Sequence, residues 1–234
     1  MKMKNKKAEQ IAARRRHKKR LKEGRRAEPS FERPIPNLLE KPTILIVCEG
    51  ENTEPSYFNQ FRLSSATVKP VGEGYNTISL VNRATQLNSQ GVYDKVWCVF
   101  DKDDFSDSNF NNAINIAKAK GFSVAYSNQA FEYWLILHFN DHQGGGMHRD
   151  QYNDIINKLL QPFNVLYDGA KSKKVSEALF ELMESADEKT GIKRIDLAIR
   201  RAERNFNQLN HSNPAKEESS STVFMLVKEL LKYV

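Results

Sequence analysis

The chain lacks the features that define two large classes of protein. No stretch of it approaches the roughly 18 consecutive apolar residues that a membrane-spanning helix requires. Its N-terminus is charged but has no apolar segment of the kind found in secretory signals. We therefore predict a cytoplasmic protein with no membrane partner.

Cysteine is scarce, with Cys48 and Cys98 the two examples among 234 residues. Each lies inside a short apolar run that is typical of a buried strand, so both are expected to be small buried thiols. A disulfide between neighbouring strands is the alternative. Neither cysteine has the setting of a nucleophile, and the Gly-x-Ser-x-Gly motif of serine hydrolases is absent.

Nucleotide-binding and calcium-binding loops are also missing. Gly72-Glu-Gly74 is not followed by the Lys-Ser/Thr of a phosphate-binding loop, so no ATP site is indicated. The acidic run that begins at Asp101 has Phe105 at the fifth position, where a calcium loop has Asp or Asn. These absences argue against an ATPase and against an EF-hand protein.

Positive charge is concentrated at the N-terminus. The chain has a net charge of +7, but residues 1–28 hold 13 Lys and Arg against 3 Glu, and the other 206 residues hold 23 against 26 acidic residues. So charged a segment cannot bury enough apolar surface to fold alone. We expect a disordered basic arm over residues 1–28 and a Pro-containing linker over residues 29–42.

The basic arm has three interpretations. It can track nucleic-acid phosphates in a salt-dependent manner, remain a solvated tail, or dock on an acidic partner. Its Ala, Gln, Lys and Arg content also favours a helix in the bound state. The arm residues expected at nucleic acid are Arg14, Arg15, Arg16, Lys18, Lys19 and Arg20.

Residues 43–140 alternate between strand and helix patterns. Short apolar runs rich in Val and Ile predict strands buried on both faces, and helical spacing predicts helices between them. This order, with short connections, is typical of a parallel four-stranded sheet flanked by helices in an α/β domain. The strands are expected over residues 43–48, 67–71, 95–100 and 122–127, and the helices from residue 53 or 54, over 77–89 and over 109–120.

The pattern changes after this domain, and residues 141–234 predict an α-helical extension. Residues 212–221 are polar and contain a proline, which indicates a loop. The helices of the extension are expected near residues 150–160, 173–188, 192–208 and 222–233.

Carboxylates follow two of the predicted strands directly. Glu49 follows the first strand, and Asp101 and Asp103 follow the third. The carboxyl ends of parallel strands meet at one edge of a sheet, and residues i and i+2 of an extended segment point the same way. Oxygen ligands of this kind suit Mg²⁺ or Mn²⁺. The alternative is that polar residues merely end the strands in turns.

Further residues follow the fourth predicted strand. Glu132 lies among aromatic residues near the same edge, where it is either a further catalytic or metal-binding group or an exposed residue of an amphipathic helix. Asn128 either anchors the loop or contacts substrate. His138 is expected to end an apolar helix with its hydrogen bonds satisfied. A proton-transfer role and a zinc site with His142 are weaker alternatives.

A second basic set lies in the extension. Arg200 and Arg204 share a helical face through their i, i+4 spacing. Together with Lys173 and Lys174 they are candidates for nucleic-acid contact, and solvated helix faces are the alternative.

The motifs together resemble a known family. Glu-Gly after the first strand and Asp-x-Asp after the third resemble the Toprim fold, a Rossmann-like fold of topoisomerases, primases and nucleases. Three longer segments around these motifs resemble the RloB-like (AbiLii-like) family of Toprim-fold proteins, which is related to OLD-family nucleases. The segments that carry this resemblance are Ile44–Phe58, Val99–Asp104 and Ser127–Phe139, within a match over most of residues 40–230.

The resemblance implies a site and a biological setting. It implies Glu49, Asp101 and Asp103 as metal-site residues, with Glu51 or Glu54 assisting. It further implies the nuclease half of a bacterial anti-phage, abortive-infection module whose partner is an OLD/AAA-type ATPase encoded alongside, and a homo-oligomer is compatible with it.

Two functions of different classes follow. The first is a Mg²⁺- or Mn²⁺-dependent nuclease that cleaves DNA, tRNA or another RNA. The second is a non-catalytic subunit that binds metal and nucleic acid and regulates the ATPase. A primase-like enzyme is disfavoured because no nucleotide-binding element is visible.

Overall fold

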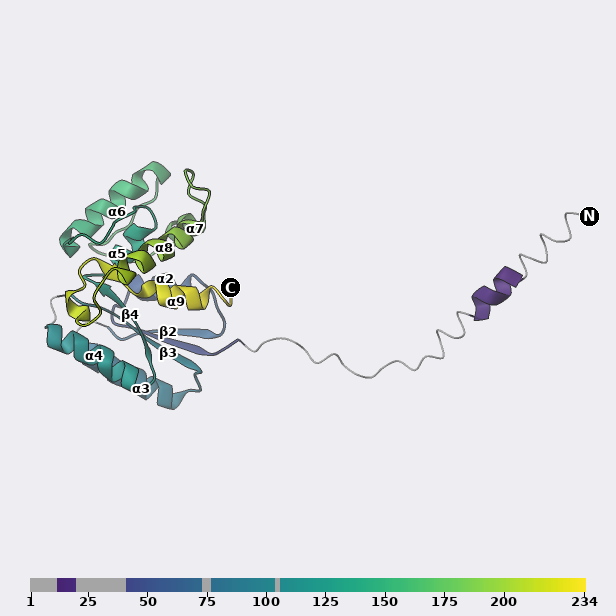
Figure 1. Ribbon diagram of the computed structural model, residues 1–234, viewed down its shortest axis with the longest axis horizontal. Coiled ribbons are helices and arrows are strands. Elements are labelled where there is room, and N and C mark those ends of the chain that lie inside the picture. The colour runs from purple at the N-terminus through teal and green to yellow at the C-terminus, as the bar shows by residue number, and fades with distance from the viewer. Residues whose placement is uncertain (1–11, 20–40, 73–76, 104–105) are drawn as a thin grey trace, which may run out of the picture. The chain divides into compact units, whose positions relative to one another are not determined.

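A five-stranded sheet forms the centre of the protein in a computed structural model, which describes residues 12–19, 41–72, 77–103 and 106–234 (Figure 1). The strand order is β2-β1-β3-β4-β5. In chain order the elements are β1 (Ile44–Cys48), α2 (Thr53–Asn59), β2 (Ala66–Pro70), α3 (Thr77–Gln90), β3 (Lys95–Asp101), α4 (Asp107–Ala119), β4 (Ser123–Asn128), α5 (Glu132–Leu137), η1 (Arg149–Gln151), α6 (Tyr152–Leu160), η2 (Gln161–Phe163), α7 (Glu177–Glu184), α8 (Arg194–Asn207), η3 (Pro214–Lys216), β5 (Ser220–Ser221) and α9 (Val223–Leu230).

The predicted α/β architecture is confirmed, but the predicted number of strands is wrong. The four predicted strands pair in parallel as β1 to β4, and β5 adds an antiparallel fifth strand beside β4. The expected loop over residues 212–221 therefore ends in a strand. Because Ser220 and Ser221 carry no apolar pattern, only their long-range pairing with Asn128 and Ser127 makes them a strand.

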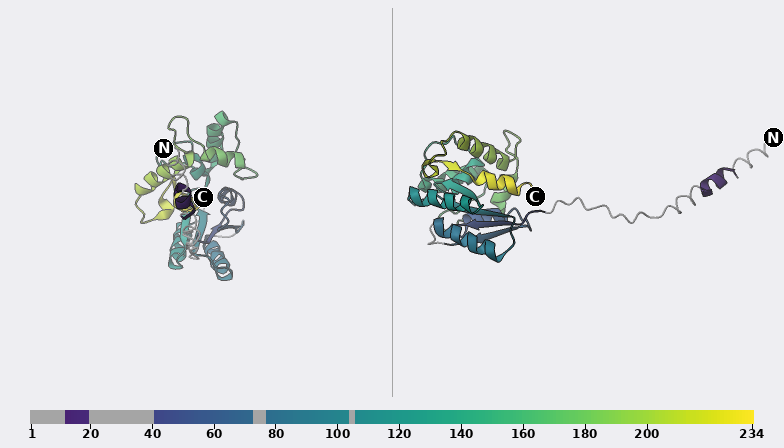
Figure 2. Two further views of the ribbon diagram at one scale, coloured as in Figure 1. Left: turned by 90° about the vertical axis from the view of Figure 1, so that its right-hand side faces the viewer. Right: turned by 60° about the horizontal axis from the view of Figure 1, so that its bottom comes forward.

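Two apolar layers cover the sheet, because alternate residues of each strand face opposite sides. Ile44 and Ile46 of β1 pack with aromatic residues of α2 and α5, and Leu45 and Val47 pack with residues of α3 and α4. Figures 1 and 2 show the sheet between these helical layers. Both cysteines are free and buried, as predicted.

The predicted helix over residues 173–188 is shorter than expected. Lys173 has a left-handed φ of 49°, and α7 begins only after Ser176, whose side chain accepts a hydrogen bond from the Leu179 N–H. The Val175 N–H donates instead to the Ser56 hydroxyl at 2.8 Å. Residues 173–176 are thus a connection that docks on α2, and this long-range contact outweighs local helix propensity.

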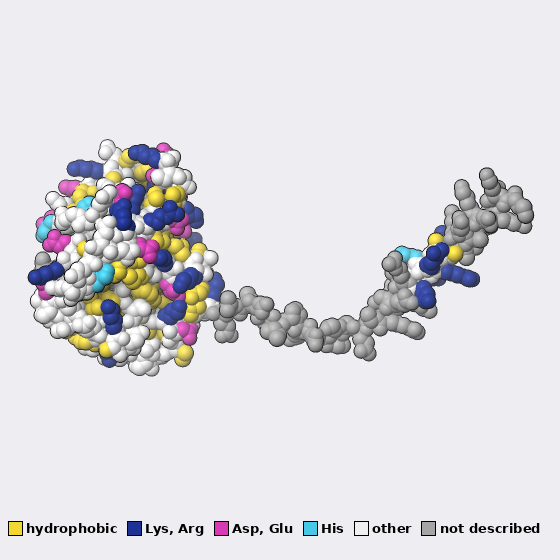
Figure 3. Space-filling view, viewed as in Figure 1, with side chains coloured by type: hydrophobic (Ala, Val, Ile, Leu, Met, Phe, Trp, Pro, Cys, Tyr) yellow, Lys and Arg dark blue, Asp and Glu magenta, His cyan; other side chains and the backbone are white. Residues whose placement is uncertain are grey.

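The N-terminal segment forms a unit separate from residues 41–234. Residues 12–19 are helical with exposed side chains, and the cationic ones are visible in Figure 3. The structure does not describe residues 1–11 and 20–40. These include Arg20, most of the predicted disordered arm and most of the predicted linker over residues 29–42. Within the described ranges, no helix combines the length and apolar character that a membrane span demands.

Candidate active site

A hollow of about 250 Å³ lies at the carboxyl ends of β1 and β3. Six carboxylates line it, and they include every acidic residue that the sequence suggested for the site. Two cationic side chains, Arg149 and Lys173, line it as well. The carboxylates are Glu49, Glu51, Glu54, Asp101, Asp103 and Glu132.

Glu49 lies one residue beyond β1, and β3 holds both its backbone and its side chain. Its N–H donates to the Val99 carbonyl at 2.9 Å, and its Oε2 accepts from the Asp101 N–H at 3.3 Å. Its Oε1 is buried without a hydrogen-bond partner among the described residues. Burial, with the charges of Asp103 and Glu54, raises the pKa of Glu49 to about 8 against the opposing Asp101 N–H.

Asp101 is the last residue of β3, where it pairs with Ser127 of β4. Its Oδ2 accepts from the Phe131 N–H at 3.0 Å, so the turn before α5 fixes the carboxylate. Burial raises the pKa of Asp101 well above its ordinary value, and the neighbouring charges of Glu54, Asp103 and Glu132 raise it further. The end of β3 therefore carries an acid that is held mainly by one backbone N–H.

Asp103 reaches the hollow by a different route from the predicted one. The expectation of an extended segment is wrong here, because Asp103 lies in a turn with a left-handed φ of 40°. Its N–H donates to the Gln129 carbonyl at 3.2 Å, and its carboxylate forms an ion pair with Arg149. Asp tolerates this backbone conformation better than most residues, which makes the turn compatible with the sequence.

Glu54 and Glu51 occupy different environments. Glu54 is buried in the first turn of α2, and its carboxylate accepts a hydrogen bond from the Gly50 N–H, whereas Glu51 is exposed at the rim. Burial first, then the charges of Glu132 and Asp103, raise the pKa of Glu54 to about 7. The structure therefore favours Glu54 over Glu51 as the buried member of the acidic set.

Glu132 faces the hollow from the first turn of α5. Its Oε1 accepts a hydrogen bond of 2.7 Å from the Tyr167 hydroxyl, which also lies 3.2 Å from the Thr53 hydroxyl. Glu132 is therefore not an exposed residue of an amphipathic helix. Tyr167 and Thr53 were not predicted for the site, because their positions in the sequence carry no acidic or spacing signal.

The donor set fits a hard divalent cation. Among the described residues, no three His, Cys, Asp or Glu side chains are grouped closely enough as they stand to hold a metal ion together. However, buried Glu54 and half-buried Glu49 and Asp101 line one hollow, and one buried oxygen of Glu49 has no partner among the described residues. Carboxylates in this arrangement repel unless they are protonated or share a cation.

Asn128 and His138 lie away from the acidic lining. The Asn128 side-chain amide donates to the Pro214 and Ala215 carbonyls at 3.3 Å each, so it anchors the loop before β5. His138 is buried and its Nδ1 lies 3.0 Å from the Trp134 carbonyl, but its Nε2 has no partner among the described residues. Burial lowers the pKa of His138 to about 3, so the ring is neutral.

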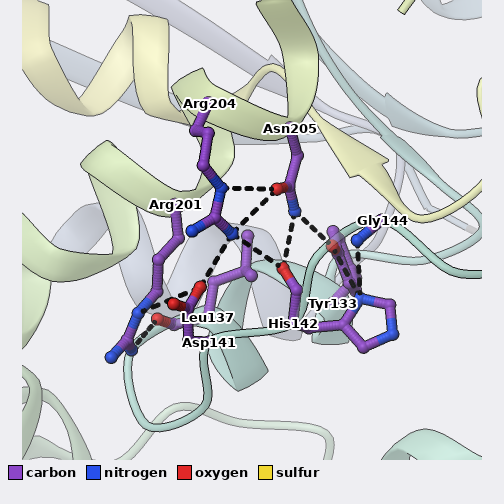
Figure 4. Close-up of polar contacts among 8 residues, drawn as sticks. All are labelled: Tyr133, Leu137, Asp141, His142, Gly144, Arg201, Arg204 and Asn205. Atoms are coloured by element: carbon purple, nitrogen blue, oxygen red, sulfur yellow. Dashed lines mark hydrogen bonds and ion pairs between the residues drawn. The ribbon is translucent and has the colours of Figure 1, made fainter. Parts of the chain in front are cut away.

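The predicted basic residues of the extension separate into different roles. Lys173 lines the acidic hollow, and Lys174 and Arg200 are exposed outside it. Arg204 instead donates to Asp141 at 2.7 Å and to the His142 carbonyl at 3.3 Å (Figure 4). Arg204 therefore ties α8 to the loop after α5.

Further hydrogen bonds beside Arg204 also link α8 to the loop after α5. The Asn205 side-chain amide donates to the His142 carbonyl at 2.8 Å and lies 3.0 Å from the Tyr133 hydroxyl, while Arg201 donates to the Leu137 carbonyl at 2.8 Å (Figure 4). His142 Nδ1 lies 3.0 Å from the Tyr133 hydroxyl, so His142 serves this network and not a pair with His138.

Gly50→Ala is expected to disturb the site. A Cβ at Gly50 would lie 2.3 Å from Oε2 of the buried Glu54 carboxylate, so this carboxylate must move. We expect a loss of about 1–3 kcal/mol in the free energy of unfolding, measured by denaturant unfolding. Gly145→Ala is the matched control because a Cβ there meets nothing within 4 Å. Equal behaviour of the two variants would contradict the role of Gly50.

A family comparison agrees with the sequence motifs. The model of the family described as RloB-like protein matches residues 44–230, which include β1, every carboxylate of the hollow and all of α9. The chain belongs to the RloB-like family. No curated protein and no solved structure matches this RloB-like protein significantly.

Arg149 is the main site residue of this RloB-like protein that sequence reasoning missed. It follows the Gly144–Gly146 loop and begins η1, and nothing in the local pattern singles it out. Its N–H donates to the Gln129 side chain at 3.0 Å, which sets η1 beside the turn that carries Asp103. This tertiary contact brings a second cation, besides Lys173, into the acidic hollow.

Proposed function

We propose that this RloB-like protein is a divalent-metal-dependent nuclease that hydrolyses phosphodiester bonds. The observation that carries the proposal is the convergence of six carboxylates on one hollow, with a buried Glu49 oxygen that has no partner among the described residues. Structural ion-pair networks balance buried acids with cations. Here the carboxylates outnumber the lining cations by six to two.

The carboxylates have different roles in the proposed site. Asp101, Asp103 and Glu49 would hold Mg²⁺ or Mn²⁺, and Glu132, positioned by Tyr167, would assist. Bound there, the metal would supply charge neutralisation of the phosphate and a water of lowered pKa. The raised pKa of Glu49 in the metal-free site also suits it to exchange a proton near neutral pH.

The finer parts of the proposal rest on the resemblance of the motifs. We propose a Toprim-type arrangement of the sheet, a relationship to OLD-family nucleases and a role in anti-phage abortive infection beside an OLD/AAA-type ATPase. The parallel strands β1 and β3, which present Glu49 and Asp101 at one edge, support the Toprim assignment. A homo-oligomer belongs to the same proposal.

One observation favours a second candidate, the non-catalytic subunit that regulates the ATPase. Arg149 pairs with Asp103, one of the proposed metal ligands. A protein that keeps this pair in the presence of Mg²⁺ would bind metal weakly and would regulate a partner instead of cutting nucleic acid. Metal-dependent turnover separates the two candidates.

The test is cleavage of labelled plasmid DNA and of total tRNA by the full chain with Mn²⁺ or Mg²⁺. Cleavage that disappears on chelation by EDTA supports the nuclease, and the substrate that is cut identifies the nucleic acid. The assay is repeated with the ATPase present, so that a silenced nuclease is activated and a regulator is not. Inactivity under both conditions would contradict the proposal.

The basic arm is expected to add salt-dependent affinity for nucleic acid. Replacement of Arg14, Arg15 and Arg16 by Gln removes three cations from an exposed helix. Because each phosphate contact contributes about 0.7 to 0.9 to the slope of log K against log salt, the variant should lose about two to three units of slope. Fluorescence anisotropy with a labelled oligonucleotide at several salt concentrations measures this, and an unchanged slope would exclude the arm from binding.

A further inference from the structure

We propose that Arg149 and Lys173 form a phosphate-binding subsite beside the acidic hollow, and that Arg149 exchanges Asp103 for the phosphate when a metal ion binds. This inference rests on the proposed function and deepens it, because it names the group of the substrate that the site recognises. It assigns roles to two side chains that the proposed chemistry does not otherwise use.

The position of the two cations supports the subsite. A second hollow of about 230 Å³ adjoins the acidic one, and Glu132, Arg149 and Lys173 line both. Among the described residues that line either hollow, Arg149 and Lys173 are the cationic ones. A phosphate at this boundary would lie between the carboxylates and two positive side chains, where a scissile phosphodiester must lie for metal-assisted hydrolysis.

The backbone at Lys173 is fixed by its surroundings. The Lys173 N–H donates to the Asp168 carbonyl at 2.8 Å, and the Asp168 carboxylate accepts from the N–H groups of Lys171 and Ser172. Asn153 accepts from the Gly169 N–H at 3.1 Å, which ties this loop to α6. The Lys173 ammonium makes no ion pair or hydrogen bond within the described part of the chain, so a rigid turn presents it to the hollow.

The backbone at Arg149 is fixed in a similar way. The Arg149 N–H donates to Gln129, and the Tyr152 hydroxyl donates to the Met147 carbonyl at 3.1 Å just before it. Upstream, the junction of Arg204, Asp141 and His142 holds the start of the same loop on α8 (Figure 4). These two anchors place Arg149 between the hollows while its side chain can change partner.

The exchange follows from the chemistry of Asp103. In the structure the Arg149 guanidinium forms an ion pair with the Asp103 carboxylate, which has 32% of its side chain accessible. A divalent cation in the hollow would compete for that carboxylate. The guanidinium, released from Asp103, has a planar fork of N–H donors that matches a phosphate. Metal binding would therefore prepare the phosphate subsite.

Two binding measurements test the subsite without relying on activity. Mn²⁺ binding is followed by electron paramagnetic resonance, and binding of inorganic phosphate to the Mg²⁺-saturated full chain is followed by calorimetry. The variants are Arg149→Gln, Arg149→Lys, Lys173→Gln, Glu49→Gln and, as the matched control, Lys171→Gln. Lys171 is exposed on the same loop but lines neither hollow.

We expect Arg149→Gln to change the affinities for Mn²⁺ and for phosphate in opposite directions. Arg149→Gln should tighten Mn²⁺ binding, because Asp103 loses its competing cation, and should weaken phosphate binding about tenfold, the value of one charge-assisted hydrogen bond. Lys173→Gln should weaken phosphate binding by about the same factor. Lys171→Gln should change neither affinity, and Arg149→Lys, which keeps the charge, should recover part of the phosphate affinity.

The outcomes separate this inference from the proposed function. Mn²⁺ binding that is lost in Glu49→Gln, with phosphate affinity unchanged in Arg149→Gln and Lys173→Gln, would overturn the subsite and leave the metal site standing. Wild-type protein that binds Mn²⁺ but no phosphate would do the same. Absence of Mn²⁺ binding, or Mn²⁺ binding unaffected by Glu49→Gln, would overturn the proposed metal site and the subsite with it.

Discussion

Asp101→Asn is expected to abolish metal-dependent cleavage while leaving the fold intact or more stable. Asn has nearly the same shape as Asp, and its side-chain oxygen can still accept the Phe131 N–H that now bonds Asp101 Oδ2 at 3.0 Å. The substitution removes one negative charge from a buried group that Glu54, Asp103 and Glu132 repel. The substitution also removes a proposed metal ligand, so we expect a rate decrease of about 10²- to 10³-fold or more.

Two measurements on three proteins decide this prediction. The rate of cleavage of plasmid DNA or tRNA and the thermal midpoint Tm are measured for wild type, Asp101→Asn and the matched control Asp154→Asn. Asp154 is exposed on α6 and lines neither hollow, so its variant should retain activity and Tm. An Asp101→Asn protein that cuts at the wild-type rate would refute the site. A variant that is inactive because it is unfolded would give no support for a catalytic role.

The stability of the metal-free protein is expected to contain a component that falls as the pH rises from about 5 to about 8. Burial raises the pKa of Glu49 from 4.5 to about 8 and that of Glu54 to about 7. Between these limits the folded protein keeps protons that the unfolded chain has lost. Because the unfolded state then binds fewer protons, the free energy of unfolding decreases with pH, by up to about 1.4 kcal/mol per pH unit for each such group.

Glu49→Gln isolates this component from other titrating groups. The variant cannot ionise at this position, so its Tm advantage over wild type should be small near pH 5 and should grow toward pH 8. For a chain of this size, each 1 kcal/mol in the free energy of unfolding corresponds to a shift of about 2–4 °C in Tm. A difference in Tm that does not change with pH would contradict the raised pKa of Glu49.

Mg²⁺ should offset the loss of stability that is expected as the pH rises. A divalent cation favours the ionised carboxylates, so Mg²⁺ should raise Tm more at pH 8 than at pH 6 and should release protons on binding. Calorimetry in two buffers of different ionisation enthalpy measures the released protons. Removal of the metal by EDTA should restore the lower Tm, and a proton release of zero would separate metal binding from these carboxylates.

The acidic site could be predicted from the sequence to a large extent, for a local reason. Glu49 and Asp101 end apolar runs that form neighbouring parallel strands, and such strand ends always meet at one edge of a sheet. The strand patterns alone therefore place Glu49 and Asp101 together. The choice of Glu54 over Glu51, and the position of Glu132 at the hollow, come from the structure.

Other parts of the site could not be predicted, because distant segments supply them. Arg149 lines the hollow from η1, and Tyr167 donates a hydrogen bond to Glu132 from the segment after η2, but neither segment carries a periodic signal. Their partners Asp103 and Glu132 are 46 and 35 residues away. Lys173 was predicted to lie in a helix, but it lies in a left-handed turn. Local propensity is worth only tenths of a kcal/mol per residue, so such contacts override it.

The sequence by itself determined the α/β class, the four parallel strands and the acidic edge, because short apolar runs and strand-end carboxylates are local properties of the chain. The tertiary structure decided which charges face those acids and how the sheet ends. Arg149 reaches Asp103, and β5 pairs with β4, through contacts between segments far apart in the chain. Packing of the whole unit selects those contacts, and no short window of sequence encodes them.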